Sequence, residues 1–149
     1  MTTRWTPNAT VACVVERAGS YLIVEEDKGG PYTLFNQPAG HIEPNERIID
    51  AVQREVREET AWRVLLTGYL GLYVHVADDG THYHSHSFEA AALEFLCTPL
   101  DPDITRTHWL TLEEIEQLEA MGRLRSPLVT RRIRDSQRGK RFPLDVIHD

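Results

Sequence analysis

The sequence predicts a single domain of the α/β or α+β class over residues 1–149. The chain has 149 residues, which is the usual length of one globular domain. Apolar residues make up 41% and charged residues 26%, as in ordinary folded proteins in water. Strand-like and helix-like segments alternate without repeats, low-complexity tracts or a linker. Together these observations indicate one hydrophobic core shared by strands and helices.

The first third of the chain predicts strands. Residues 9–15 and 20–26 are apolar runs with β-branched residues, separated by Ala18 and Gly19, so we expect two paired strands joined by a turn. A loop composition follows at 27–31, and residues 33–39 form a short extended segment that ends at Pro38.

The middle of the chain predicts a helix and a long hairpin. The helix runs from Asn45, taken as its N-cap, to Thr60. Residues 63–76 and 86–98 are rich in apolar and aromatic residues and predict two strands, with a turn at 78–80. The helix is inferred from apolar residues at spacings of three and four: Ile48, Ile49, Val52 and Val56.

Two more helices are predicted in the last third. Thr111 and Glu114 match a capping box, so a helix should run from about 111 to 121. Ser126 followed by Pro127 is typical of an N-cap and a first helical position, and the helix that starts there should end at Gly139.

Composition also limits the function classes. No apolar run approaches the roughly 20 residues of a membrane span, and the first ten residues lack the apolar stretch of a secretory signal, so a cytoplasmic protein is expected. Cys13 and Cys97 lie in apolar, strand-like segments, and we expect two buried free thiols rather than a disulfide or a zinc pair.

The net charge of −7 is unevenly distributed. Residues 123–149 carry 8 − 3 = +5, which leaves 8 − 20 = −12 for the preceding part. An acidic front and a basic tail would suit binding of a cation and a phosphate side by side, although a solvated basic helix explains the tail equally well. The overall acidity disfavours a nucleic-acid partner.

Three carboxylates share one face of the first predicted helix. On a helical wheel Glu55, Glu58 and Glu59 fall within roughly 100° and overlap the edge of the apolar stripe. Half-buried like charges cost several kcal/mol unless they are neutralised, and a hard divalent cation such as Mg²⁺, or Mn²⁺ in its place, would do so. Arg54 would orient Glu58 from four residues away. Alternating surface charges that aid solubility are the other interpretation.

The flanks of this helix carry a longer pattern. Residues 40–62 read GHIEPNERIIDAVQREVREETAW, which resembles the signature of the Nudix hydrolases: Gly, five residues, Glu, seven residues, then Arg-Glu-apolar-x-Glu-Glu-x-Gly-apolar. Ala61 stands where the family has the glycine that ends the helix in a left-handed turn. Alanine can adopt that turn at a cost of roughly 1 kcal/mol, or the helix ends otherwise.

The resemblance implies a mixed β-sheet sandwiched between α-helices and a magnesium site in the loop and helix of the signature. It implies that Glu46 supports the loop or a water in the outer sphere of the metal, and that Glu58, which Arg54 orients, or Glu59 takes the proton of the attacking water. Glu89 or Glu94 on a later strand could be the base or an extra ligand instead. The implied metal ligands are Glu55, Glu58, Glu59 and the backbone carbonyl of Ala39 or Gly40.

The segments LRSPLV and RFPLDVI near the C-terminus resemble a bacterial phosphatase subgroup of the family. This implies a hydrolase of nucleoside di- and triphosphates and of thiamine-pathway pyrophosphates such as hydroxymethylpyrimidine diphosphate, with release of orthophosphate. The alternatives are a general enzyme for dinucleoside polyphosphates or nucleotide sugars, and a non-catalytic nucleotide-binding module. We expect a small-molecule substrate and a monomer or homodimer.

Two further groups are candidates for substrate contacts. His82, His84 and His86 alternate and should project from one face of a strand, where they could contact phosphate or a heterocycle, hold zinc or simply be exposed. Arg131, Arg134 and Arg138, with spacing typical of one helical face, could contact substrate phosphate, acids of the domain or solvent.

Overall fold

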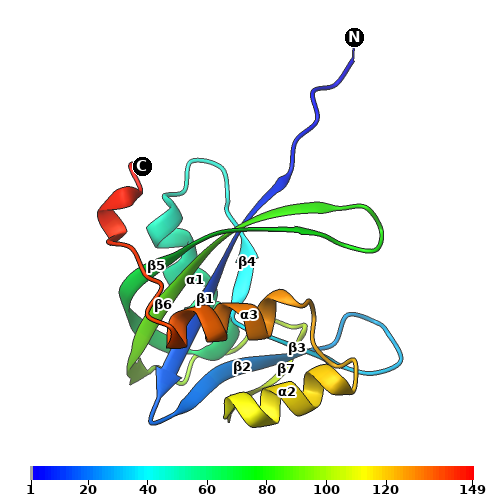
Figure 1. Cartoon of the computed structure of the whole chain (residues 1–149), viewed down its shortest axis with the longest axis vertical. Coiled ribbons are helices and arrows are strands. Elements are labelled where there is room, and N and C mark those ends of the chain that lie inside the picture. The colour runs from blue at the N-terminus through cyan, green and yellow to red at the C-terminus, as the bar shows by residue number, and fades with distance from the viewer. Residues whose placement is uncertain (1) are drawn as a thin grey trace.

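The structure, a computed structural model, describes residues 2–149 (Figure 1). Within them, a seven-stranded mixed sheet has the order β3-β2-β1-β6-β5, with β4 paired to β1 and β7 paired to β2. The predicted fold class, a single domain with a mixed sheet and three α-helices, is confirmed. The strands are β1 (Asn8–Arg17), β2 (Ser20–Glu26), β3 (Leu34–Asn36), β4 (Ala39–His41), β5 (Trp62–Val76), β6 (His82–Phe95) and β7 (Ile104–Leu110), and the helices are α1 (Ile48–Thr60), α2 (Leu112–Ala120), α3 (Leu128–Gln137) and the 3₁₀ helix η1 (Leu144–Val146).

Strand β1 lies at the centre of the sheet and is covered on both faces (Figure 1). Its six residues from 10 to 15 are all buried, the pattern of a strand between two layers. On one face Cys13 and Phe88 pack with Val52 of α1. On the other face Val14 packs with Ile133 of α3. The sheet therefore separates α1 from α2 and α3.

The long hairpin of β5 and β6 differs from its predicted limits at the second strand. That strand begins at His82 rather than at residue 86, so His82, His84 and His86, the histidine run, are part of the sheet. It ends at Phe95, and Cys97 lies beyond it in a left-handed conformation with φ 56°. The prediction of a buried thiol is therefore right for Cys13 and wrong for Cys97, which is exposed because no sheet layer covers it there.

The start of α1 also differs from the prediction. Asn45 is not the N-cap: it has φ 63°, whereas a cap residue needs an extended backbone, and it lies in the turn closed by the Glu46 N–H and the Glu43 carbonyl. The helix begins at Ile48, with Arg47 in the cap position. At the other end Ala61 adopts the left-handed turn, with φ 61° and ψ 18°.

The capping box predicted at Thr111 is present, whereas α3 begins one residue later than predicted, with Pro127 rather than Ser126 in the cap position. The Thr111 hydroxyl accepts the Glu114 N–H at 3.2 Å, and the Glu114 side chain accepts the Thr111 N–H at 3.3 Å. The Ser126 hydroxyl accepts the Leu128 N–H at 3.2 Å ahead of α3. Two strands were not predicted from the sequence: β4, which is too short to show the alternation of a strand, and β7.

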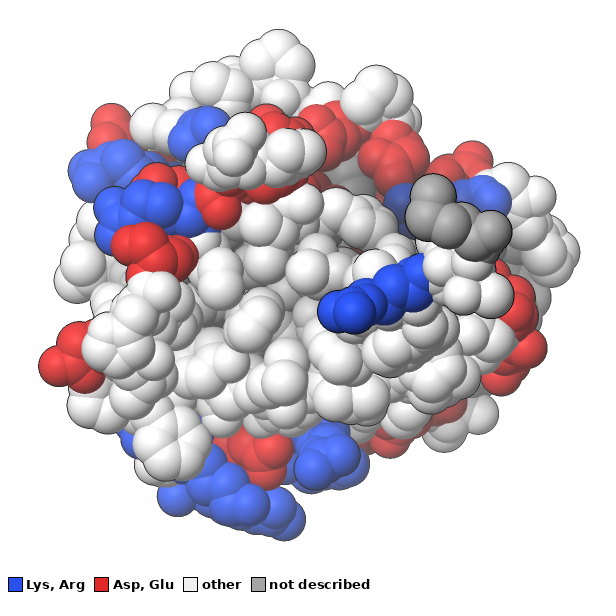
Figure 2. Space-filling model, turned by 90° about the horizontal axis from the view of Figure 1, so that it is seen from above, with Lys and Arg blue, Asp and Glu red and all other residues white. Residues whose placement is uncertain are grey.

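Charge on the surface is mixed in sign. Figure 2 shows one face on which small groups of Lys and Arg alternate with Asp and Glu around an uncharged middle. In the part of the chain described, no helix is both long enough and apolar enough to cross a membrane.

Candidate active site

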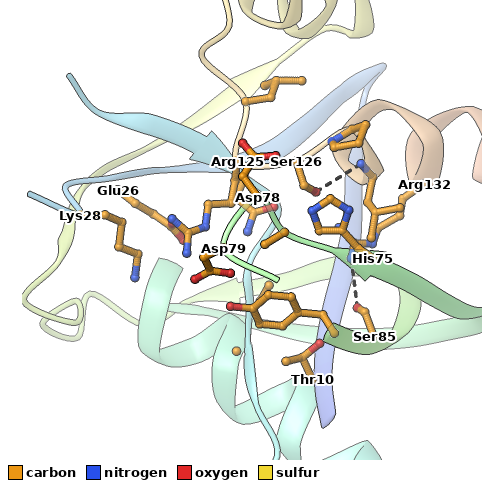
Figure 3. Close-up of a pocket in the computed structure, with 18 of the residues that line it drawn as sticks. Thr10, Glu26, Lys28, His75, Asp78, Asp79, Ser85, Arg125, Ser126 and Arg132 are labelled. Carbon is orange, nitrogen blue, oxygen red and sulfur yellow. Dashed lines mark hydrogen bonds between the residues drawn. The ribbon is translucent and has the colours of Figure 1, made fainter. Parts of the chain in front are cut away.

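A pocket of about 840 Å³ opens beside β4 (Figure 3). This volume is typical of sites for nucleotide-sized ligands. Its walls come from elements far apart in the sequence, which the sheet brings together. They include the end of β2 (Glu26), the β5–β6 hairpin (His75, Asp78, Asp79, Tyr83, Ser85), the segment before α3 (Arg125, Ser126) and α3 itself (Arg132).

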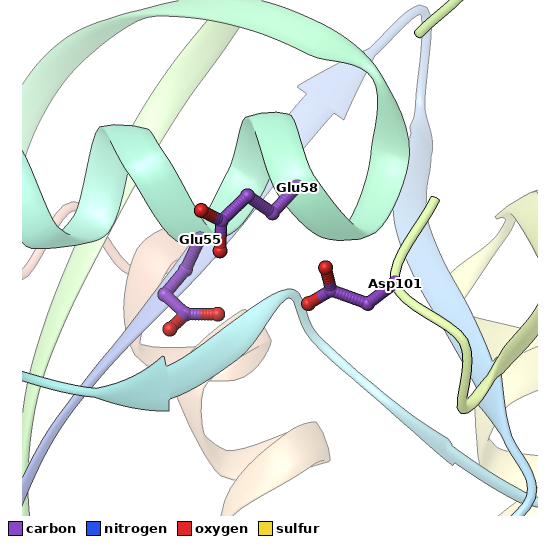
Figure 4. A group of neighbouring side chains, drawn as sticks. All are labelled: Glu55, Glu58 and Asp101. Atoms are coloured by element: carbon purple, nitrogen blue, oxygen red, sulfur yellow. The ribbon is translucent and has the colours of Figure 1, made fainter. Parts of the chain in front are cut away.

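Three carboxylates meet next to this pocket (Figure 4). Glu55 and Glu58 project from α1, and Asp101 reaches them from the loop between β6 and β7. One oxygen of each lies within 4.8 Å of the others. The Asp101 N–H donates to the Glu58 carbonyl at 3.0 Å, which holds the loop on the helix. Such a set of hard oxygen donors fits a divalent cation that keeps part of its water.

Asp101 was not predicted, because it belongs to a loop that shares no pattern with the helix. Burial raises the pKa of Glu55 and of Asp101, and Glu58 raises the pKa of Asp101 further. Both groups therefore hold their charge less readily than a carboxyl in water. A bound cation would lower both pKa values, since it binds the ionised carboxylates and displaces their protons.

Glu59 occupies a different position from Glu55 and Glu58. Its carboxyl is 6% exposed and accepts the Ala39 N–H of β4 at 2.8 Å. Burial, with Glu26 and Glu55 nearby, raises the pKa of Glu59 to about 9. It therefore carries a proton at neutral pH when no cation is bound. Its membership of one ligand set with Glu55 and Glu58 stays a prediction.

Strand β4 lies directly against these acids. A Cβ atom on Gly40 would be 2.1 Å from the Glu55 carboxyl carbon, so only glycine allows this approach. Gly40 and Ala39 also line the pocket. A backbone carbonyl of Ala39 or Gly40 was the predicted metal ligand, and the backbone of these two residues lies against both Glu55 and Glu59.

Arg54 ties the acidic side chains to the loop. Its guanidinium donates to Glu55 at 2.8 Å, to Glu58 at 3.0 Å and to the His41 carbonyl at 3.0 Å. It also makes two bonds to Glu46, at 2.6 and 2.9 Å, and these raise the pKa of Arg54 and lower that of Glu46. Glu46 in turn accepts the Glu43 N–H at 3.0 Å, and its supporting role stays a prediction.

The histidine run faces away from the pocket. Tyr83 and Ser85 line it, whereas the alternate residues of β6 project from the other face. There the rings of His82 and His84 contact Trp5, and His86 shares a hydrogen bond of 2.9 Å with the Tyr69 hydroxyl. Burial lowers the pKa of His86.

Arg131, Arg134 and Arg138 are also outside the pocket wall, and Arg138 lies 3.7 Å from Asp135. Arg131 lies near Asp135 at 4.0 Å, and Arg134 lies near Glu116 at 3.6 Å. The arginine of α3 that lines the pocket is Arg132, which the spacing of exposed arginines did not indicate.

Glu89 and Glu94 do not join the three carboxylates. Glu89 accepts a hydrogen bond from the Ser136 hydroxyl at 2.6 Å and forms an ion pair with Arg141 at 2.7 Å, on the α3 side of the sheet. Glu94 is exposed and pairs with Arg63 at 3.1 Å.

Known proteins share both the sequence and the fold. A profile of the NUDIX domain matches residues 6–132. The phosphatase NudJ of Escherichia coli K12 is 41% identical over 145 residues, which cover 96% of this chain and 92% of that protein. A Nudix hydrolase from Nitrosomonas europaea is 40% identical, with a TM-score of 0.92 over 97% of both chains. The MutT protein of Methanosarcina mazei, 19% identical with a TM-score of 0.72 over 93% of this chain and 100% of that one, shares the fold.

These likenesses cover nearly the whole chain, and two acids of the signature, Glu55 and Glu58, meet Asp101 in one acidic cluster. The family acts on small molecules with the help of a divalent metal, which agrees with the donors found here. The chain belongs to the Nudix family and is a hydrolase of the type of the NudJ phosphatase.

Proposed function

We propose that the protein is a Mg²⁺-dependent hydrolase of nucleoside di- and triphosphates and of thiamine-pathway pyrophosphates such as hydroxymethylpyrimidine diphosphate, and that it releases orthophosphate. The observation that carries the metal dependence is the meeting of Glu55, Glu58 and Asp101 beside the pocket. The substrate class rests on the similarity to the NudJ phosphatase.

In this proposal the acids hold the cation and the pocket holds the substrate beside it. Bound Mg²⁺ would supply charge neutralisation for the phosphate oxygens and a polarised water. Arg54 keeps Glu55 and Glu58 in fixed orientations through its hydrogen bonds. Glu58 or Glu59 accepts the proton of the attacking water, and Asp101 takes the place of an extra ligand that Glu89 or Glu94 was expected to fill.

A substrate panel tests the reaction. The purified protein with Mg²⁺ is assayed against nucleoside di- and triphosphates, hydroxymethylpyrimidine diphosphate, dinucleoside polyphosphates and nucleotide sugars. Phosphate release is measured with and without added pyrophosphatase. Phosphate that appears only when pyrophosphatase is present contradicts orthophosphate release, and turnover confined to the last two classes favours the general enzyme.

The role of the acids is tested by Glu58→Gln and Glu59→Gln, which keep the shape and remove the charge. Each should lower kcat by roughly 10²- to 10⁴-fold. Unchanged turnover in both would contradict the catalytic account. A non-catalytic binding module is disfavoured because Glu55, Glu58 and Glu59 are all present.

A further inference from the structure

Arg132 of α3 is a buried cation without an acidic partner. It is 5% exposed. Its guanidinium donates to three neutral acceptors: the Ser87 hydroxyl at 2.8 Å, the Ser85 hydroxyl at 3.0 Å and the Gln37 side-chain carbonyl at 3.1 Å. Among the ion pairs of residues 2–149, none involves Arg132, although the exposed Arg131 and Arg134 on the same helix each have one.

This arrangement is costly for a protein with no ligand. A buried charge costs several kcal/mol unless an opposite charge accompanies it. Burial lowers the pKa of Arg132 to about 10, so the side chain remains charged at neutral pH. The ring of Tyr73, 5.7 Å away, offers only a weak attraction. Three of the five guanidinium N–H groups have protein acceptors, which leaves two for a ligand.

The position of Arg132 places this charge in the pocket. Arg132 and its partner Ser85 both line the wall, on the side away from Glu26 and Lys28 in Figure 3. Gln37 lies two residues before Ala39, whose N–H binds Glu59, and Cα atoms two residues apart are at most about 7 Å from each other. Arg132 therefore lines the same pocket as Ala39 and Gly40, the two residues whose backbone lies against Glu59 and Glu55.

We propose that Arg132 binds phosphoryl oxygens of the substrate, as a positively charged side chain of the pocket in addition to Lys28 and Arg125, which also line it. The proposal rests on the proposed function, in that it takes the substrate to be a phosphoanhydride, and it names the residue that receives it. Two hydroxyls and an amide hold the guanidinium in place, so its planar fork is ready for a phosphate.

Binding of methylenediphosphonate tests the proposal, because its P–C–P link cannot be hydrolysed. Calorimetry measures its dissociation constant with Mg²⁺ and, separately, with EDTA. The unaltered chain should bind it with Mg²⁺, and Arg132→Gln should bind it at least 10-fold more weakly. Arg138→Gln is the matched control: it removes the same charge from an exposed side chain at the end of α3 and should stay within twofold.

Three results would overturn the proposal: no binding by the unaltered chain in either buffer, an Arg132→Gln protein with an unchanged constant, or an equal loss in Arg138→Gln. Should Arg132→Gln fail to fold in a thermal melt, Arg132→Lys decides by the same criterion, since it keeps the charge and loses the fork. A chain that binds the diphosphonate through Arg132 yet hydrolyses nothing in the substrate panel contradicts the proposed function alone.

Discussion

Gly40 has no Cβ atom, and this leaves room for the Glu55 carboxylate. An added Cβ would lie 2.2 and 2.3 Å from the two carboxylate oxygens. The end of a flexible side chain can move away at little cost, so Gly40→Ala should lose only about 1 kcal/mol of unfolding free energy. The displaced Glu55 carboxylate would no longer be in position to bind the ion, so Mg²⁺ affinity and activity should fall roughly 10- to 100-fold.

Calorimetry with Mg²⁺, initial rates and urea unfolding measure these effects. Gly30→Ala is the control, since the nearest atom to its new Cβ is the Tyr32 carbonyl oxygen at 3.9 Å. Unchanged Mg²⁺ affinity in Gly40→Ala would show that Glu55 does not bind the ion.

The buried carboxyl of Glu59 makes stability depend on pH when no metal is present. Its pKa rises from 4.5 to about 9 on folding, so between these values the folded protein keeps a proton that the unfolded chain releases. The unfolding free energy should therefore fall as pH rises from about 5 to 9, by at most about 1.4 kcal/mol for each pH unit.

Urea unfolding in EDTA at several pH values measures this slope. Glu59→Gln should flatten it, because the amide does not titrate. An identical slope in the variant would mean that other groups cause the dependence.

The C-terminus of α1 carries the one departure from the family signature. Ala61 adopts the left-handed conformation that glycine takes without strain, and its side chain is buried. Relief of about 1–2 kcal/mol of strain in Ala61→Gly exceeds the roughly 0.8 kcal/mol lost with one buried methyl. The variant should be more stable by about 0.5 kcal/mol.

Denaturant unfolding compares Ala61→Gly with Ala120→Gly, an exposed position at the end of α2. The second change should cost roughly 0.5–1 kcal/mol, because glycine loses more freedom on folding. If both variants lose stability equally, the turn at Ala61 carries no strain.

Over the whole molecule, residues 139–149 join the two sides of the sheet. Phe142 exchanges two backbone hydrogen bonds with Tyr69 of β5, at 2.8 and 2.9 Å, and the Asp149 carboxylate accepts the Ile48 N–H at the start of α1. Arg141 binds Glu89, which is 5% exposed. The end of the chain thus neutralises a buried acid.

Arg141→Gln should therefore cost about 1–3 kcal/mol of unfolding free energy, since Glu89 keeps only its bond to Ser136. Adding Glu89→Gln should recover part of this, as expected for a contacting pair. Unfolding and kcat are measured for all three variants. A fall of kcat in Glu89→Gln as large as that in Glu58→Gln would restore Glu89 as a catalytic base.

Local patterns were enough to predict the three α-helices, all strands except β4 and β7, the capping box at Thr111 and the acidic face of α1. The reason is that helical and strand periods depend on residues close in the chain. The same rule predicted that Glu55, Glu58 and Glu59 lean inward: Glu55 and Glu59 are buried, whereas Glu58 is only half-buried. The family resemblance added the fold and the hydrolase activity.

Contacts between distant segments required the folded chain. The loop after β6 brings Asp101 close to Glu58, and Ala39 of β4 donates a hydrogen bond to Glu59. The pairing of β6 in the sheet turns His84 away from the pocket and leaves Arg132 lining it. Spacing along one element shows which side chains share a face, but what that face meets depends on strand pairing across the sheet, which no local period encodes.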